Sequence, residues 1–148
     1  MNYITVYEIS ENYFPFYGLI PSVLLLLFSF LLFKSIKLKA KGIKMGIATA
    51  TGEPALCAVM EKYDMLHYFS AIYSTFTVGA AKTEPKVYDV VLEAIGTAKE
   101  TTWVFEDALY AATTAKNNGY KVVGIYDKSE PKTDELKAIV DIYINNYS

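Results

Sequence analysis

The chain has 148 residues and a formal net charge of −2, which fits one domain and gives no indication of nucleic-acid binding. All 14 basic residues are lysines, so a phosphate group could be bound only by Lys, hydroxyl or backbone N–H groups and not by a bidentate Arg. The single cysteine, Cys57, cannot form an internal disulfide, which favours a reducing, cytoplasmic compartment.

The N-terminal segment, residues 1–37, differs in composition from the rest of the chain. Residues 13–33 carry no charged side chain and are about long enough to cross a hydrocarbon core of ~30 Å as a helix. Glu8 and Glu11 precede this run and lysines follow it, so a spanning helix would leave the C-terminal domain in the cytoplasm. The lysines are Lys34, Lys37, Lys39, Lys41 and Lys44.

Three interpretations of the uncharged run stay open: a membrane anchor, a buried helix, and the product of an out-of-frame or misassigned start. Pro15, Gly18 and Pro21 weaken its first half and leave an apolar core of about a dozen residues, a length also typical of a buried helix. A cleavable signal peptide is not favoured, because no small-residue cleavage site follows the run.

Residues 38–148 alternate short apolar runs with amphipathic stretches. Strands are expected at 43–48, 71–74, 102–105, 120–126 and 141–144, with helices between them that end near residues 63, 96, 118 and 139. Gly42 and Gly96 are expected to mark the ends of two helices, and Pro54 and Pro85 to lie in the first turns of the helices that begin near them. This alternation predicts an α/β domain with a parallel sheet and right-handed crossovers.

Spacing assigns the apolar faces of two of these helices. The first is expected to bury Leu56, Val59 and Met60, and the second Val87, Val90, Val91 and Ala94.

Polar residues follow several of the predicted strands. Thr49, Lys82, Glu106 and Asp107 all fall at strand ends or in loops that could share the carboxyl edge of the sheet. Ligands bind at that edge in parallel sheets, so these residues predict one site.

Three of these segments, in this order, resemble motifs of the haloacid dehalogenase (HAD) superfamily, in the branch that contains β-phosphoglucomutase and phosphoglycolate phosphatase. The segments are Gly46-Ile47-Ala48-Thr49-Ala50-Thr51, Lys82-Thr83-Glu84-Pro85-Lys86-Val87-Tyr88 and Trp103-Val104-Phe105-Glu106-Asp107-Ala108. The resemblance covers roughly three quarters of the chain and implies a HAD-like Rossmannoid fold, a three-layer α/β architecture around a parallel sheet.

The resemblance also implies a mechanism in which a carboxylate attacks phosphorus and water hydrolyses the resulting acyl phosphate. Thr49 and Lys82 would be the catalytic residues: Thr49, with the N–H of Ala50, would hold one phosphate oxygen, and Lys82 would neutralise another and hold the nucleophile in place. Asp107, assisted by Glu106, would bind Mg²⁺. The substrate would be a small phosphorylated metabolite.

Each of these residues also has a purely structural interpretation. Thr49 could make a local hydrogen bond, Lys82 could be a solvated loop residue, and Glu106-Asp107 could only cap the next helix. His67, the only histidine, falls in a loop between a helix and a strand and is expected to be structural, and Cys57 is expected to pack on its helix.

The first motif of the family, a strand ending Asp-x-Asp-Gly-Thr, has no counterpart here because no aspartate precedes Asp64. The β-rich run 4–10 places Glu8 and Ser10 in the two acidic positions, and glutamate is one methylene longer than aspartate. Too few residues separate Glu8 from Thr49 to hold the helical cap of this branch. Residues 3–9 or the apolar run could fill the place of the missing central strand.

The sequence therefore predicts an N-terminally truncated or altered HAD-type hydrolase that is inactive as written. The alternative is a non-catalytic, phosphate-binding or membrane-tethered pseudophosphatase. Residues 38–148 alone are expected to aggregate or to form a molten state.

Overall fold

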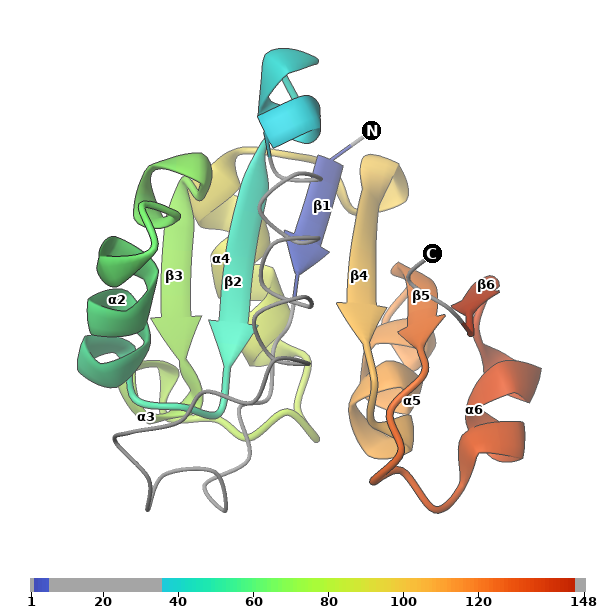
Figure 1. Ribbon diagram of the computed structural model, residues 1–148. Helices are drawn as coiled ribbons and strands as arrows, with labels where there is room; N and C mark the ends of the chain where they lie inside the picture. Colours follow the sequence, from blue (N-terminus) through green and yellow to red (C-terminus); the bar gives the residue numbers. More distant parts are fainter. Residues whose placement is uncertain (1, 6–35, 146–148) are drawn as a thin grey trace.

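Six short strands form one parallel sheet in the part of the chain that the computed structural model describes, residues 2–5 and 36–145 (Figure 1). The strands are β1 (Asn2–Thr5), β2 (Met45–Thr49), β3 (Ala71–Ser74), β4 (Thr102–Glu106), β5 (Lys121–Ile125) and β6 (Ile142–Ile144). Their order across the sheet is β3-β2-β1-β4-β5-β6, and every neighbouring pair is parallel. The predicted α/β class and parallel sheet are confirmed.

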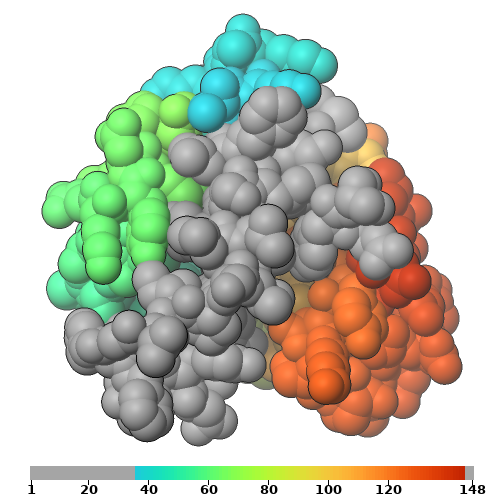
Figure 2. Space-filling model, viewed as in Figure 1, coloured from blue at the N-terminus to red at the C-terminus, as the bar shows by residue number. Residues whose placement is uncertain are grey.

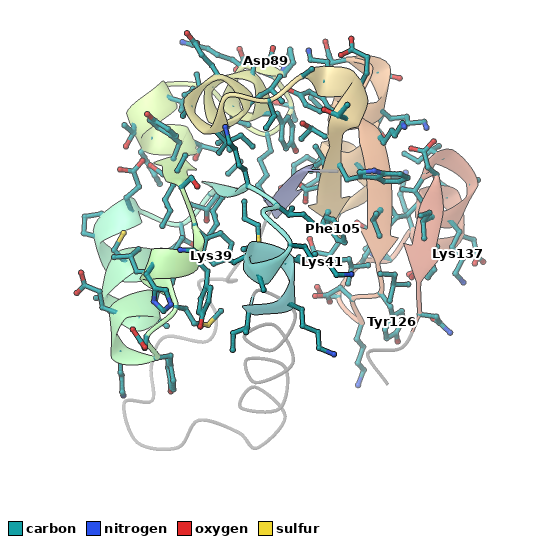
Figure 3. The ribbon with its side chains drawn as sticks, turned by 90° about the horizontal axis from the view of Figure 1, so that it is seen from above. Lys39, Lys41, Asp89, Phe105, Tyr126 and Lys137 are labelled. Carbon is teal, nitrogen blue, oxygen red and sulfur yellow. The ribbon has the colours of Figure 1, made fainter. Side chains whose placement is uncertain are left out.

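Helices cover both faces of this sheet. They are α2 (Glu53–Lys62), α3 (Thr75–Val78), α4 (Lys86–Ile95), α5 (Leu109–Asn117) and α6 (Thr133–Ile139), with a further helix over residues 36–40 and 3₁₀ turns η2 (Leu66–Tyr68) and η3 (Lys99–Thr101). Seen along the strands, Asp89 of α4 and Phe105 of β4 lie on opposite sides of the sheet (Figure 3). The α2–α3 and α5–α6 segments form opposite flanks of the face viewed in Figure 2.

The larger core lies between the sheet and the α4–α5 side. Ala48 and Val104 of the central strands pack there against Val91 of α4 and Ala112 of α5. A smaller core lies on the other face, and its buried residues are Ile47, Leu56, Met60 and Met65. The two cores, one on each face, make the three layers expected from the sequence.

The central position of the sheet belongs to β1. Thr5 pairs with Ile47 of β2 on one side and with Phe105 of β4 on the other, so β2 and β4 do not pair with each other. The strand at residues 2–5 therefore occupies the central position of the sheet, which the sequence assigned either to residues 3–9 or to the apolar run. Glu8, Ser10 and the uncharged run 13–33 lie outside the described residues.

Helix ends follow the glycines and prolines closely. Gly42 (φ +72°) and Gly96 (φ +63°) adopt the left-handed conformation that commonly follows a helix, and Pro54 lies in the first turn of α2. One assignment of a helix face was wrong: Ala94 is exposed, whereas Ile95 is buried beside Val91. The buried stripe follows the row Val87, Val91 and Ile95, spaced four residues apart, and Ala94 lies about 100° away from Ile95 around the helix.

Gly46 allows α4 to approach β2 closely. A Cβ atom at this position would lie 2.4 Å from Cγ1 of Val91 and 3.1 Å from Cγ2 of Ile95. We expect Gly46→Ala to lower the free energy of unfolding by about 1–3 kcal/mol, because the added methyl overpacks the core. Urea denaturation measures this loss. In the Val91→Ala background Gly46→Ala should cost much less, and strictly additive losses would contradict the packing explanation.

Within residues 2–5 and 36–145, no helix is both long enough and apolar enough to cross a membrane. The helix over residues 36–40 lies at the amino end of β2 (Figure 1). Lys37, Lys39 and Lys41 are exposed, and Figure 3 labels Lys39 and Lys41.

Candidate active site

Thr49 is the last residue of β2 and is fully buried. Its Oγ1 accepts a hydrogen bond of 3.0 Å from the N–H of Thr51, so the local bond suggested by the sequence is present. Ala50 follows in a bend and is partly buried. The hydroxyl thus shapes the turn that presents the backbone N–H groups between β2 and α2.

Lys82 and Glu106 form a buried ion pair. Lys82 lies in the loop before α4 and Glu106 is the last residue of β4, yet each side chain is at most 1% exposed, with Nζ 3.5 Å from Oε1. The interpretation of Lys82 as a solvated loop lysine is therefore wrong. Two charges removed from water need further polar partners, and this distance is too long for a strong hydrogen bond.

Tyr88, in the first turns of α4, is the residue of this cluster that the sequence did not suggest. Its hydroxyl donates a 2.8 Å hydrogen bond to Oε1 of Glu106 and lies 3.3 Å from the carbonyl oxygen of Ala111. The side chain is completely buried in the α4–α5 core. An aromatic residue in the apolar stripe of a helix was the only signal, because a buried Tyr usually needs a polar partner.

Burial raises the pKa of the Glu106 carboxyl to about 7, while the Lys82 charge and the Tyr88 hydrogen bond act in the opposite direction. Within the described residues, neither Nζ of Lys82 nor Oε2 of Glu106 has a hydrogen-bond partner. Buried polar atoms are nearly always satisfied, so such atoms call for an explanation, and a bound ligand is one.

Asp107 follows β4 directly and is partly buried. Thr5 of β1 pairs with Ile47 and Phe105, so Thr49 and Asp107, each two residues farther along, lie at the same level on either side of the β1 line. Two strand spacings place their backbones about 10 Å apart. The carboxyl edge thus places a hydroxyl at the end of β2 and a carboxylate just after β4 at the same level of the sheet.

The loops around this edge are tied together by two further carboxylates. Glu53 of α2 accepts a 2.7 Å hydrogen bond from the N–H of Ser74, at the end of β3. Glu130 accepts one of 2.9 Å from the N–H of Leu109, at the start of α5. Glu106, which could have capped α5, instead bonds to Tyr88. Neither Glu53 nor Glu130 was expected, because both contacts join residues 21 apart in the chain.

The other candidates lie elsewhere. His67 belongs to η2 at the amino end of β3, where its Nδ1 is 3.3 Å from Asp64, and so it is remote from the carboxyl edge. Cys57 lies on α2 and is partly buried. Its thiol pKa is raised mainly by burial, and further by the nearby charges of Glu53 and Glu61. Among the described residues, no group of three or more His, Cys, Asp or Glu side chains is arranged so that it could hold a metal ion.

Comparison with known proteins is consistent with this geometry. A family model described as "Haloacid dehalogenase-like hydrolase" matches residues 35–125. A curated relative, the phosphorylated carbohydrates phosphatase of Thermotoga maritima, is 31% identical over 81 residues, which are 55% of this chain and 38% of the relative.

Two solved structures show the same fold. CbbY from Rhodobacter sphaeroides, crystallised in complex with phosphate, aligns with a TM-score of 0.68 at 21% identity over 76% of this chain and 51% of that one. A HAD phosphatase from Thermococcus onnurineus aligns with a TM-score of 0.66 at 22% identity over 77% and 52%. The chain spans about half the length of these structures and about two fifths of the curated relative.

Proposed function

The chain belongs to the haloacid dehalogenase-like hydrolase family, and on this basis we propose that it binds Mg²⁺ and a small phosphate ester without turning the ester over. The observation that carries the proposal is the buried Lys82–Glu106 pair, in which Nζ and Oε2 lack hydrogen-bond partners within the described residues. A cation near Oε2 and an anion near Nζ would satisfy both atoms.

The carboxylates at the end of β4 fit Mg²⁺. This ion prefers oxygen ligands, keeps several waters and is usually held by one or two carboxylates. Asp107 would be one ligand, and Oε2 of Glu106 would bind the ion or one of its waters. Bound Mg²⁺ neutralises charge on phosphate oxygens. A nearby cation would also favour the ionised form of Glu106, whose pKa burial otherwise raises to about 7.

The phosphate group would lie between the ends of β2 and β4. The N–H of Ala50 and the Thr49 hydroxyl would donate hydrogen bonds to one of its oxygens, and Lys82 would supply a point charge without the two-pronged geometry of Arg. The chain contains no Arg that could take over this contact. CbbY, which shares this fold, was crystallised in complex with phosphate, and this supports proposing phosphate as a ligand of the present chain.

Turnover is not expected, because no aspartate precedes Asp64 and so no aspartate can occupy the attacking position on β1 or just after it. Glu8 is the nearest carboxylate in the sequence to that position. Its extra methylene would displace the attacking oxygen by about a bond length, and a misplacement of ~1 Å can cost ~10²-fold in rate. Ser10 cannot replace a carboxylate general acid.

A phosphatase assay with an aryl phosphate and Mg²⁺ tests the proposal, together with calorimetric titration of Mg²⁺ and of inorganic phosphate. We expect binding of both ions without release of the aryl alcohol. Turnover that disappears in Glu8→Ala but persists in the matched Glu11→Ala variant would overturn the non-catalytic part of the proposal. Failure of Mg²⁺ and phosphate to bind would overturn the remainder.

Membrane attachment through residues 13–33 remains a prediction that is compatible with this site. The lysine-bearing helix over residues 36–40 lies at the amino end of β2, whereas the proposed site lies at the carboxyl ends of the strands (Figure 1). A membrane on the lysine side would leave the site facing away from it.

A further inference from the structure

The Glu106 carboxylate is held unequally at its two oxygen atoms. Oε1 accepts the 2.8 Å hydrogen bond from Tyr88 and is also the atom 3.5 Å from Nζ of Lys82. Oε2 has no hydrogen-bond partner among the described residues, although the side chain is fully buried. The described residues therefore satisfy one carboxylate oxygen of Glu106 and leave the other, buried oxygen without a hydrogen bond.

Tyr88 is well placed to keep the carboxylate in this orientation. The residue is completely buried in the first turns of α4, a helix that begins just after Pro85 and ends at the left-handed Gly96. Its backbone N–H donates to the carbonyl of Pro85 at 3.0 Å, which fixes the start of the helix. A buried ring on a helix has little rotamer freedom, so the hydroxyl is a fixed donor aimed at Oε1.

We propose that Tyr88 is a positioning residue of the divalent-cation site, which holds Oε1 of Glu106 so that Oε2 faces the cation. Groups that hydrogen-bond to metal ligands commonly set the orientation of those ligands, and their removal typically lowers metal affinity ~10–100-fold. The inference rests on the proposed function, because it requires that Mg²⁺ binds at the end of β4.

Tyr120 provides a matched control. It is also a buried tyrosine, with its ring centroid 6.0 Å from that of Tyr88, and its hydroxyl donates a 2.6 Å hydrogen bond to Asp89. Asp89 lies on α4 and pairs with Lys99 at 2.9 Å, away from the residues proposed to bind the ion. Tyr→Phe at either position removes one hydroxyl–carboxylate hydrogen bond and keeps the ring volume.

The test is calorimetric titration of Mg²⁺ into the full chain, Tyr88→Phe and Tyr120→Phe at one fixed pH, with urea denaturation of each. We expect the Kd for Mg²⁺ to rise at least tenfold in Tyr88→Phe and less than twofold in Tyr120→Phe, at a similar loss of stability. Both variants should fold, since the ring that fills the core is retained.

Three results would overturn the inference, and they are distinguishable. Unchanged Mg²⁺ affinity in Tyr88→Phe would remove the positioning role but leave the proposed metal site intact. An equal loss of affinity in both variants would show that general destabilisation is the cause. Absence of Mg²⁺ binding by the unaltered chain would overturn the proposed function together with the inference.

Discussion

The full chain is expected to unfold in a single sharp thermal transition, and residues 38–148, expressed without the N-terminal segment, are expected to lack that transition. The structure gives the reason: β1 separates β2 from β4, so its removal divides the sheet and leaves two unpaired inner edges. Exposed inner edges with apolar faces favour aggregation. Circular dichroism during heating, with light scattering, measures the result. A cooperative transition in residues 38–148 would show that β2 and β4 can pair directly.

A point substitution separates the effect of β1 from that of the other deleted residues. Ile4→Pro removes a ladder N–H from the central strand, and we expect a loss of roughly 3 kcal/mol. Ile142→Pro, at the first and exposed position of the edge strand β6, is the matched control and should cost far less. Equal losses in the two variants would mean that β1 is not essential to the sheet.

Lys82→Met is expected to destabilise the chain by about 3–5 kcal/mol at pH 8, since it leaves the Glu106 charge buried and uncompensated. The cost should shrink toward pH 5. Burial raises the folded-state pKa of Glu106 to about 7 although the Lys82 charge lowers it, so without Lys82 the carboxyl binds its proton more readily and is neutral in the folded variant at pH 5. A carboxyl pKa raised on folding favours the folded state below its unfolded value of 4.5, and this advantage is lost as the pH rises through the folded value.

Lys86→Met is the control for this experiment, because Lys86 is an exposed lysine at the start of α4, four residues from Lys82. Its replacement should change the free energy of unfolding by less than about 0.5 kcal/mol at either pH. Urea denaturation at pH 5 and pH 8 compares the two variants. A loss for Lys82→Met that does not depend on pH would show that packing, and not the buried charge pair, causes the destabilisation.

Local signals were sufficient to predict much of the fold. Strand 71–74 and the left-handed glycines at 42 and 96 agree with the structure, because short apolar runs and backbone conformation depend on neighbouring residues. The limits of the buried face of α4 were harder to predict: Ala94 was assigned to this face, but Ile95 is the buried residue. Which residues of α4 are buried depends on how the whole helix is rotated against β2. Gly46 allows the close approach of Val91 and Ile95 to β2, and the residue pattern of α4 alone contains no information about this contact.

The candidate site was also predicted only in part from the sequence. The resemblance singled out Lys82 and Glu106, and the structure places them 3.5 Å apart, although the roles proposed for them stay predictions. Tyr88 and Glu130 were missed because their partners, Glu106 and Leu109, lie 18 and 21 residues away. Hydrogen bonds between residues so far apart in the sequence depend on how the helices pack in the folded chain. Tyr and Glu are also common in helices and loops without such a role, so the residue types alone do not reveal these contacts.

The position of β1 also constrains the order of events during synthesis. Asn2 pairs with Thr102, one hundred residues later, so the strand made first cannot gain its second neighbour until β4 has left the ribosome. At ~5–20 residues per second, that interval lasts roughly 5–20 s. Pairings so distant in the chain form slowly, because the intervening segment must first be ordered. The centre of the sheet is therefore completed late, after β2, β3 and α4 have had time to associate.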